Sequence, residues 1–362
     1  MAKILYAAGT TAHIRSFHTD YINALRSEGH EVLTMAKGEE ADFDVPFQKK
    51  MLSLENLRCQ SKIRRILKRE CFDAIILNTT LAAFNIRMAL PRRKRPRVLN
   101  LVHGYMFRPN PVGIKEKIFL FAEKFLRKRT DAIIVMNEED LKAARDYSLT
   151  GGSIVKIRGM GAKVKEITVS PDDIRASLNS KNKFVISFTG EICLAKNQNM
   201  LISLLPRLKK EIPEIALWLM GAGGEKDNFE RLAAELGVSD SVIFTDYVSN
   251  PCDYIAASDL YVTASKKEGL PFNVIEALGC EKTVIASDIK GHRDIIEDGE
   301  NGFLFSLDNP EELVRKIVAA YKGELAPSKE KMVSQYKKFS KEEVFEETLS
   351  AIKEGINLHF CK

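Results

Sequence analysis

Short apolar runs that alternate with amphipathic stretches constrain the fold of this 362-residue chain more than any other feature. Short apolar runs bounded by polar turns are typical of strands buried in a parallel sheet, and the amphipathic stretches supply crossover helices. Such βαβ units predict an α/β fold with mainly parallel sheets. Helices are expected at 17–27, 62–69 and 115–129, and strands at 4–7, 32–36, 74–77, 98–102, 132–135, 154–157, 184–188, 216–220, 242–244, 260–263 and 284–286.

The pattern loosens near residue 160, between two series of strands, and the chain is too long for one ordinary domain. We expect an N-terminal doubly wound domain over 1–165 and a second over 166–340. A last helix, in segment 341–362, begins after Ser340 as its N-cap and is expected to pack back on the N-terminal domain. Ligands bind at the carboxyl ends of strands in such sheets, so the two domains are expected to face a central cleft.

The composition is typical of a soluble globular protein, and no apolar run approaches the ~20 residues of a membrane-spanning helix. Residues 4–8 are interpreted as a first strand rather than a signal segment, because polar residues follow directly. The six cysteines are scattered without a Cys-x-x-Cys pair, which argues against a zinc site or a disulfide framework. A reducing, cytoplasmic location is therefore expected.

The net charge of +6 conceals an uneven distribution. Residues 1–165 contain 31 Lys and Arg against 17 Asp and Glu, whereas residues 166–362 contain 24 against 32. This asymmetry indicates an anionic partner of the first half, or else a solvated basic face. The basic run 92–97 and the amphipathic segment 115–129 contribute to it, and the latter can pack as a core helix or lie on an anionic bilayer. Nucleic-acid binding is not expected, because no reading motif accompanies the charge.

The most informative segment is 265–278, where a strand ends, a tight loop follows and Pro271 suits the first turn of a helix. Gly269 allows backbone amides to approach a ligand closely, and a helix N-terminus attracts phosphate. The carboxylates of Glu268 and Glu276 can accept hydrogen bonds from sugar hydroxyls. The segment thus indicates a nucleotide or sugar phosphate site, with helix capping and a surface glutamate as the alternative.

Glu268 and Glu276 resemble the Glu-x7-Glu motif of retaining GT-B glycosyltransferases, in the Glu-Gly-Leu-Pro…Ile-Glu-Ala form of family 4. The resemblance covers nearly the whole chain and implies a GT-B fold, in which two Rossmann-like domains face a central cleft. Further segments resemble the family in the family's order, at 188–191 with 196–197, 220–223, 244–248, 257–262, 287–291 and 298–304.

The resemblance implies that Glu276 binds the ribose and that His103 and Glu268 are catalytic, lying at the donor sugar. Lys196 would neutralise the diphosphate, which gains charge as it leaves. One departure concerns the residue after Gly190, where many relatives have an arginine and this chain has Glu191. The full set implied for donor binding is Gly9, Gly190, Lys196, Tyr247, Val248, Gly269, Leu270, Pro271 and Glu276.

Histidines mark the predicted site in the first half of the chain. His103 follows a strand and precedes a glycine, so it is expected at the sheet edge where ligands bind, or else bonded within its loop. Gly9 alone represents the family's glycine-containing first loop, and a lone glycine is a weak signal. His13 and His18 follow at helical spacing, near the acceptor or on the helix surface.

The expected function is a retaining hexosyltransferase that moves a sugar from a nucleotide sugar, expected to be a UDP-sugar, to a polysaccharide, lipid-linked or glycolipid acceptor. No cofactor and no metal are expected, because no Asp-x-Asp triplet or ligand spacing is visible. The resemblance implies front-face attack, in which the leaving phosphate accepts the proton of the acceptor, so that no protein nucleophile is needed. The alternatives are a GT-B nucleotide-sugar epimerase and a non-enzymatic nucleotide-sugar-binding protein. A dinucleotide oxidoreductase is disfavoured, since its Gly-x-Gly-x-x-Gly loop is missing.

Overall fold

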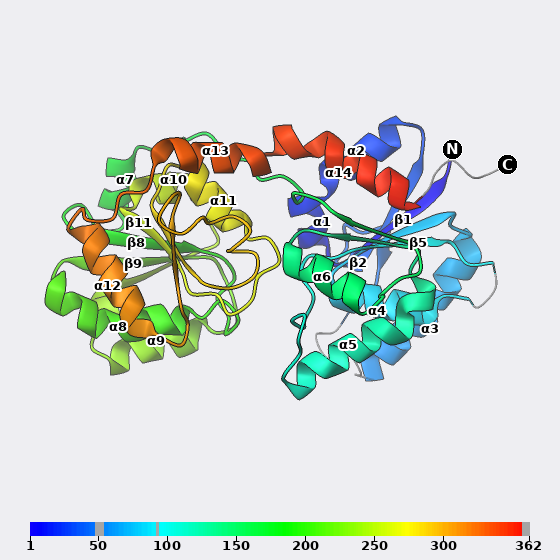
Figure 1. Ribbon diagram of the computed structural model, residues 1–362, viewed down its shortest axis with the longest axis horizontal. Helices are drawn as coiled ribbons and strands as arrows, with labels where there is room; N and C mark the ends of the chain where they lie inside the picture. Colours follow the sequence, from blue (N-terminus) through cyan, green and yellow to red (C-terminus); the bar gives the residue numbers. More distant parts are fainter. Residues whose placement is uncertain (48–53, 92–93, 357–362) are drawn as a thin grey trace. The chain divides into compact units, whose positions relative to one another are not determined.

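The computed structural model describes residues 1–47, 54–91 and 94–356, which form two compact units (Figure 1). Unit 1 comprises Met1–Met160 and the chain from Val344 onward, and unit 2 comprises Gly161–Glu343. Each unit contains one parallel sheet flanked by helices. The chain thus contains two α/β units, and the second is inserted between the parts of the first.

The sheet of unit 1 has seven strands in the order β3-β2-β1-β4-β5-β6-β7. This order reverses at β1, which pairs in parallel with both β2 and β4. The gap between the carboxyl ends of β1 and β4 is therefore the switch point, where doubly wound sheets bind ligands. The strands are β1 (Lys3–Thr10), β2 (Glu31–Lys37), β3 (Phe43–Asp44), β4 (Ala74–Asn78), β5 (Arg97–Leu101), β6 (Ala132–Val135) and β7 (Ser153–Lys156).

The helices of unit 1 cover this sheet, and the first of them departs from the prediction. The helix expected at 17–27 is interrupted at His18, whose φ of −123° separates α1 from α2. The helical pattern missed this break because the His18 side chain is fully buried and pairs with Tyr6 on β1. The helices are α1 (Thr11–Phe17), α2 (Thr19–Ser27), α3 (Leu54–Glu70), α4 (Thr80–Ala89), α5 (Ile114–Leu126), α6 (Glu138–Asp146) and α14 (Lys341–Ile356).

Helix α14 lies beside α2 and packs on unit 1 (Figure 1). The Phe345 ring stacks on Tyr21 with centroids 4.9 Å apart. The Thr348 hydroxyl donates to the Gly159 carbonyl at 2.8 Å. A Cβ at Gly355 would lie 2.8 Å from the side chain of Leu99 on β5, so glycine allows the close approach of helix and sheet.

The sheet of unit 2 repeats the same topology with six strands, in the order β10-β9-β8-β11-β12-β13. Its switch point lies between β8 and β11, which pair in parallel. The strands are β8 (Phe184–Thr189), β9 (Ile215–Met220), β10 (Val242–Asp246), β11 (Leu260–Thr263), β12 (Val284–Ser287) and β13 (Phe303–Phe305). The helices are α7 (Pro171–Ser177), α8 (Gln198–Glu211), α9 (Lys226–Glu235), α10 (Pro251–Ala257), α11 (Phe272–Gly279), α12 (Pro310–Tyr321) and α13 (Lys329–Phe339).

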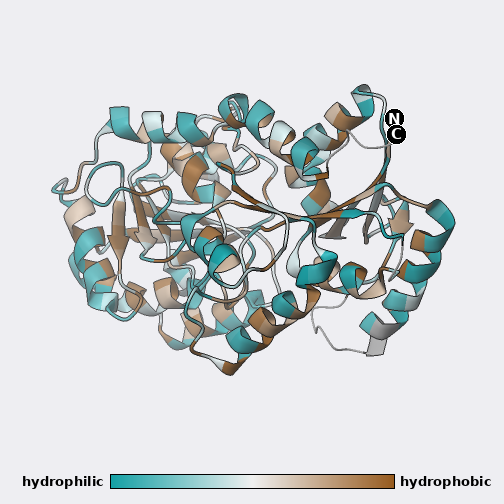
Figure 2. Cartoon of the chain, turned by 45° about the vertical axis from the view of Figure 1, so that its right-hand side comes forward, coloured by the Kyte–Doolittle hydropathy of each residue, from teal (hydrophilic) through white to brown (hydrophobic). Residues whose placement is uncertain are grey.

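The strands form the cores of both units, as their continuous apolar sequences predict. Every residue of β4, β6, β9, β11 and β12 is buried, and Figure 2 shows apolar strands beneath helices that are polar on one side. All the predicted strands are present, and the α/β prediction is confirmed. Strands β3 and β13 were not predicted, because two or three residues carry too little periodic signal.

A buried ion pair holds α5 against α4 in unit 1. The guanidinium of Arg87, fully buried, binds both carboxylate oxygens of Glu123 at 2.7 and 2.8 Å. Arg87 also donates to Thr130 Oγ1 at 3.2 Å and to the Ala83 carbonyl at 3.0 Å. Because both charges are desolvated, removing one partner would leave the other buried and uncompensated.

We therefore predict that Arg87→Met lowers the free energy of unfolding by about 3–5 kcal/mol, the usual cost of breaking a buried pair. Urea unfolding followed by far-ultraviolet circular dichroism measures the change. The double variant Arg87→Met/Glu123→Leu should recover most of the loss, because it removes both charges and refills the space with apolar atoms.

The matched control is Arg207→Met on α8. Arg207 pairs with Glu311, but their side chains are 57% and 42% exposed, so this change should cost less than about 1 kcal/mol. Equal losses for Arg87→Met and Arg207→Met would contradict the role given to the buried pair.

Candidate functional site

The carboxyl end of β8 is joined to β11 and α11 at the switch point of unit 2. The Thr189 backbone N–H donates to the hydroxyl of Tyr261 on β11 at 3.1 Å. The side-chain amide of Asn273, in the first turn of α11, donates to the Thr189 carbonyl at 2.8 Å. The start of α11 is thereby fixed where a doubly wound sheet binds its ligand.

Loops around this point contact one another through their backbones, which only glycine permits. A Cβ at Gly221 would lie 2.0 Å from the Gly190 carbonyl oxygen, and one at Gly291 would lie 2.6 Å from the Gly269 carbonyl oxygen. Both residues also have positive φ, +143° and +82°. The loops after β8, β9, β11 and β12 therefore form one closely packed set.

An ion pair links two of the predicted site residues. Lys196 Nζ lies 2.6 Å from Glu268 Oε1, and the two side chains are 23% and 11% exposed. Backbone contact supports the pair, because the Lys266 N–H donates to the Ala195 carbonyl at 2.9 Å. The side chain of Asn197 also donates to the Ala264 carbonyl at 3.0 Å. The loops after β8 and β11 are thus held together by non-covalent contacts, and they place a lysine beside a carboxylate.

Glu276 lies one turn into α11 and is partly buried. Burial raises the pKa of its carboxyl to about 8, and the negative charge of the Cys252 thiolate adds to this, while Lys165 opposes it. Near neutral pH the carboxyl therefore holds its proton for much of the time. A partner that supplies hydrogen-bond donors would favour the ionised form.

His292 is a residue of this loop set that the sequence did not single out. It is fully buried, and its Nδ1 lies 2.7 Å from the Ser287 carbonyl oxygen. A carbonyl only accepts, so Nδ1 carries the proton and Nε2 keeps its lone pair. Within the described part of the chain, Nε2 is buried without a hydrogen-bond partner. Burial lowers the pKa of His292, an effect that the charge of Glu268 opposes. Its one sequence signal is its position directly after Gly291.

The remaining predicted residues of unit 2 lie on loops at the same sheet edge. Tyr247 and Val248 directly follow β10, and the Tyr247 side chain is 81% exposed while Val248 is partly buried. Leu270 and Pro271 are buried in the loop that enters α11. Glu191 is exposed, so the acid that replaces the family's arginine lies at the surface of the loop after β8.

In unit 1 the carboxyl ends of β1 and β4 meet at Gly9 and Thr79. A Cβ at Gly9 would lie 3.2 Å from Thr79 Oγ1, which is tighter than an ordinary contact. Thr79 has a φ of +68°, a strained conformation for a β-branched residue. Such strain persists only where the surrounding structure enforces it, and it concentrates at functional sites.

Three histidines gather beside this point. The ring centroid of His13 lies 4.7 Å from that of His103 and 5.1 Å from that of His18, and the rings of His18 and His103 are also 5.1 Å apart. The surface interpretation of His18 is wrong, because this residue is fully buried. Helical spacing suggested that His13 and His18 are neighbours, but no local pattern links them to His103 on the loop after β5.

Burial keeps two histidines of this cluster, His13 and His103, neutral. It lowers the pKa of His13 to about 4. It also lowers the pKa of His103 well below its ordinary value, and the nearby His13 adds to that shift. The Nε2 atoms of His13 and His103 are buried, and no described residue forms a hydrogen bond with either. Two imidazole nitrogens are thus desolvated without compensation from the protein.

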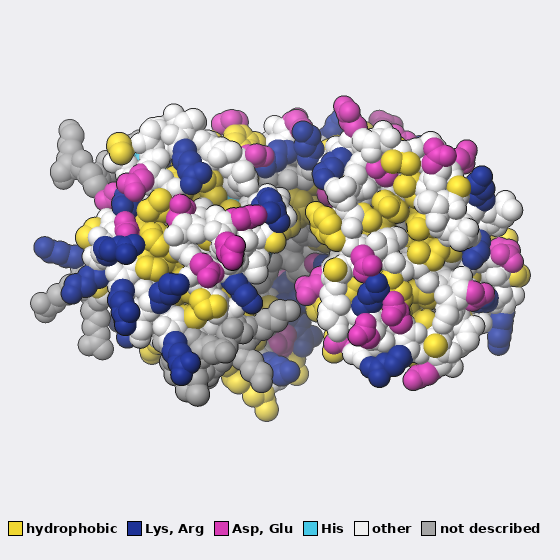
Figure 3. Space-filling model, turned by 180° about the vertical axis from the view of Figure 1, so that it is seen from behind, with side chains coloured by type: hydrophobic (Ala, Val, Ile, Leu, Met, Phe, Trp, Pro, Cys, Tyr) yellow, Lys and Arg dark blue, Asp and Glu magenta, His cyan; other side chains and the backbone are white. Residues whose placement is uncertain are grey.

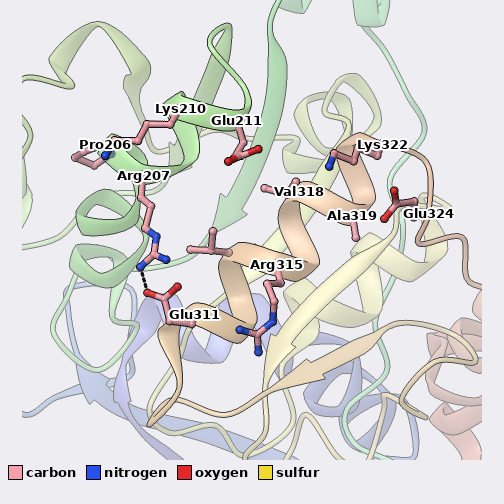
Figure 4. A pocket seen from close by; sticks show the side chains of 11 residues that line it. Pro206, Arg207, Lys210, Glu211, Glu311, Arg315, Val318, Ala319, Lys322 and Glu324 are labelled. Carbon is pink, nitrogen blue, oxygen red and sulfur yellow. Dashed lines mark hydrogen bonds and ion pairs between the residues drawn. The ribbon is translucent and has the colours of Figure 1, made fainter.

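A groove of about 800 Å³ lies elsewhere in unit 2, between α8 and α12 (Figure 4). Arg207 and Glu311 bridge it, and Lys210, Arg315 and Lys322 add positive charge. None of the predicted site residues lines this groove. Its walls are helix surfaces rather than the loops at the carboxyl ends of the strands, so we do not assign the ligand site to it.

Two family models match the chain. The model described as Glycosyltransferase Family 4 matches residues 16–158, and the one described as Glycosyl transferases group 1 matches residues 170–339. The chain is similar to EpsD of Bacillus subtilis (strain 168), with 31% identity over 333 residues, which covers 88% of this chain and 87% of the relative.

Other similarities extend this relation. An N-acetylgalactosamine-N,N'-diacetylbacillosaminyl-diphospho-undecaprenol 4-alpha-N-acetylgalactosaminyltransferase of Campylobacter jejuni is 34% identical over 130 residues, covering 36% of this chain and 34% of that protein. The crystal structure of Anabaena Alr3699/HepE in complex with UDP has a TM-score of 0.76 at 19% identity, covering 98% of this chain and all of the other. The fold is therefore GT-B, with two Rossmann-like units, and the chain belongs to family 4 of the glycosyltransferases.

Proposed function

We propose that this glycosyltransferase takes its sugar from a nucleotide sugar, most simply a UDP-sugar, and retains the anomeric configuration. The Lys196–Glu268 pair beside the start of α11 carries the proposal, because it sets a cation and a carboxylate where a sugar diphosphate needs both. The UDP in the similar HepE structure supports the choice of base. The lipid-linked substrate named for the Campylobacter relative supports a lipid-linked, glycolipid or polysaccharide acceptor.

The diphosphate is proposed to bind at the start of α11. The backbone amides of Gly269 and Leu270 and the partial positive charge of the helix N-terminus would hold it, and Lys196 would neutralise it. Gly190, which has no side chain, would allow the phosphates to approach the end of β8. This arrangement stabilises the charge that develops on the leaving diphosphate, so we propose that no metal ion bridges the phosphates and that no cofactor is needed.

The nucleoside is proposed to bind along the adjoining loops. Glu276 would accept hydrogen bonds from the ribose hydroxyls, in agreement with a carboxyl group whose raised pKa a donor-rich partner would lower again. Tyr247 and Val248 would contact the base, since an aromatic side chain that is 81% exposed at the end of β10 can stack on a flat ring.

The reaction itself is proposed to require no protein nucleophile. When the diphosphate takes over the charge of Lys196, the Glu268 carboxylate becomes available to the hydroxyls of the donor sugar. His103 is proposed as the second catalytic contact with that sugar, and Gly9 as a close backbone approach to the substrate. The departing phosphate would accept the proton of the acceptor hydroxyl on the face from which the acceptor attacks.

We further propose that unit 1 binds the cytoplasmic face of an anionic membrane through α5. The apolar side chains of Ile114, Ile118, Phe121 and Phe125 recur along one helix face and are 52–78% exposed. The inner face of α5 is held by the buried Glu123. An exposed apolar stripe flanked by lysines and arginines is typical of helices that lie in a membrane interface.

The surroundings of α5 agree with this role. A groove of about 950 Å³ adjoins Phe125, with apolar residues in its lining and cations from Arg64, Lys68, Lys94 and Arg129. Figure 3 shows Lys and Arg side chains exposed on unit 1, with Asp and Glu side chains among them. Of the predicted basic run, Arg92 and Arg93 lie outside the described residues, and Arg95 binds Asp131. No helix among the described residues combines the length and apolarity needed to cross a bilayer.

We predict that the purified protein releases nucleoside diphosphate from one member of a panel of nucleotide sugars, most readily a UDP-sugar. The rate should be the same with and without added Mg²⁺, because Lys196 and backbone amides meet the phosphate charge. A coupled assay for nucleoside diphosphate measures it. Turnover only with Mg²⁺ or Mn²⁺ would refute the metal-free diphosphate site, and binding without any turnover would indicate a nucleotide-sugar-binding protein.

Lys196→Ala should lower this turnover by about 100-fold, the scale of losing one group that stabilises a transition-state charge, yet hardly change uridine binding. Lys209→Ala is the control, because Lys209 pairs with Asp240 away from these loops. Similar effects of both changes would remove Lys196 from the site.

We predict that Glu276→Ala weakens UDP binding by about 10- to 100-fold, since charge-assisted hydrogen bonds contribute roughly 1.5–3 kcal/mol. The affinity of Glu276→Gln for UDP should lie between those of the wild type and Glu276→Ala, because glutamine keeps one acceptor oxygen. Isothermal titration calorimetry measures both affinities. Unchanged affinity in the alanine variant would exclude Glu276 from the ribose site.

The buried carboxyl of Glu276 should make the stability of the folded protein depend on pH. The folded protein keeps the Glu276 proton up to about pH 8, whereas the unfolded chain loses it near pH 4.5. Stability is therefore lost progressively as the pH rises through that window. Glu276→Gln abolishes this loss, so at pH 8 the variant should melt at or above the temperature of the wild type.

Finally, the protein should bind vesicles that contain anionic lipid and dissociate as salt rises, and Phe121→Ser/Phe125→Ser should weaken this binding at least ~10-fold. Co-sedimentation measures the effect. Ile167→Ser/Leu236→Ser, at exposed apolar positions of unit 2, is the control and should bind like the wild type. If the wild type ignores anionic vesicles at low salt, the membrane proposal fails and the transferase proposal stands.

A further inference from the structure

We propose that His13, His18 and His103 form a binding site for a transition-metal ion of the zinc class in unit 1. One nitrogen from each imidazole lies within 4.8 Å of the others. The three rings come from α1, from the break between α1 and α2, and from the loop after β5. The site stands on this geometry and does not depend on the proposed sugar transfer, with which it shares His103.

The spacing of the rings suits a three-histidine centre. Nitrogens that bind zinc at about 2.0–2.1 Å in tetrahedral geometry are roughly 3.3 Å apart, so small ring rotations would close the observed triangle. The centroid separations of 4.7–5.1 Å are nearly equal on all three sides. The rings are also inclined at 46–89° to one another rather than stacked, so their edges can converge on one point.

The chemical state of the ligands is also suitable. Metal ions bind the neutral imidazole, and burial keeps His13 and His103 neutral. The Nδ1 atom of His18 lies 2.9 Å from the Tyr6 hydroxyl, which leaves Nε2 as the ligand atom of His18. A hydrogen bond to the other ring nitrogen is the arrangement that orients metal-binding histidines.

A metal ion would also account for the buried polar atoms. Nε2 of both His13 and His103 is buried without a hydrogen-bond partner among the described residues. Leaving such atoms uncompensated destabilises a fold. The Phe17 ring lies 5.0 Å from His13 and 6.2 Å from His103, so the cluster has an apolar wall.

The donor set selects the class of ion. Imidazole suits zinc, cobalt, nickel and copper, whereas magnesium and calcium require oxygen ligands. Three histidines leave at least one coordination position for water or a hydroxyl oxygen of a substrate. The site is therefore distinct from the magnesium-independent diphosphate site proposed in unit 2, and supplying magnesium would not fill it.

The experiment is a titration of the full-length, chelator-treated protein with Co²⁺ and Zn²⁺. We expect one equivalent of Co²⁺ to bind, with the visible absorption bands of four-coordinate cobalt, and Zn²⁺ to displace it. His13→Leu and His103→Leu should each weaken binding at least ~100-fold, since even the loss of a group that only orients a ligand costs 10–100-fold. Tyr6→Phe should weaken binding by about 10-fold.

His30→Leu is the matched control, because His30 lies in unit 1 and pairs with the backbone of Ala2 away from the cluster. His13 is partly exposed, so its leucine variant is expected to fold, and circular dichroism of each variant checks this. Wild-type protein that binds less than one equivalent of Co²⁺ and Zn²⁺ would overturn the proposal. So would a folded His13→Leu variant that binds cobalt as tightly as the wild type.

Discussion

The whole arrangement depends on where the strand order reverses in each parallel sheet. At that point two neighbouring crossovers leave in opposite directions, so the loops at the carboxyl ends are not covered by a helix. In unit 2 those loops then approach until their backbones touch, which Gly221 and Gly291 permit because no Cβ stands between them. Side chains are consequently limited to a few positions. Lys196 and Glu268 occupy two of these, and their ion pair closes the loop set.

That pair gives the free protein a partner for each charge before any substrate arrives. A lysine and a carboxylate at 11–23% exposure would be unfavourable singly, but together they satisfy each other. A diphosphate that binds there must replace Glu268 as the partner of Lys196. Both the affinity for the diphosphate and the selectivity for it therefore depend on this replacement. The histidine cluster of unit 1 differs, because burial keeps His13 and His103 neutral and no described residue forms a hydrogen bond with the Nε2 atom of either.

The sequence predicted the strands and the family well, because continuous apolar runs and the 265–278 segment are local signals. The sequence did not predict contacts between residues that are far apart in the chain and meet only in the folded structure. The pairing of Lys196 with Glu268, the burial of His292 and the meeting of His13 with His103 each join residues from different loops. The spacing of these residues in the sequence follows neither the helical nor the strand period, so no local pattern relates them. The break at His18 was missed for a related reason, since a single buried side chain overrode a regular helical pattern.

Helix α14 makes unit 1 discontinuous in the chain, with consequences for biosynthesis. Tyr21 and Leu99, which α14 covers, are synthesised before unit 2, whereas Phe345 and Gly355 are synthesised after it. At ~5–20 residues per second, the 184 residues between Met160 and Phe345 take on the order of 10–40 s to synthesise. Throughout that interval unit 1 displays an apolar surface, while unit 2 has its whole sequence available first. Until α14 is synthesised, chaperones can therefore bind the apolar surface of unit 1 that α14 later covers.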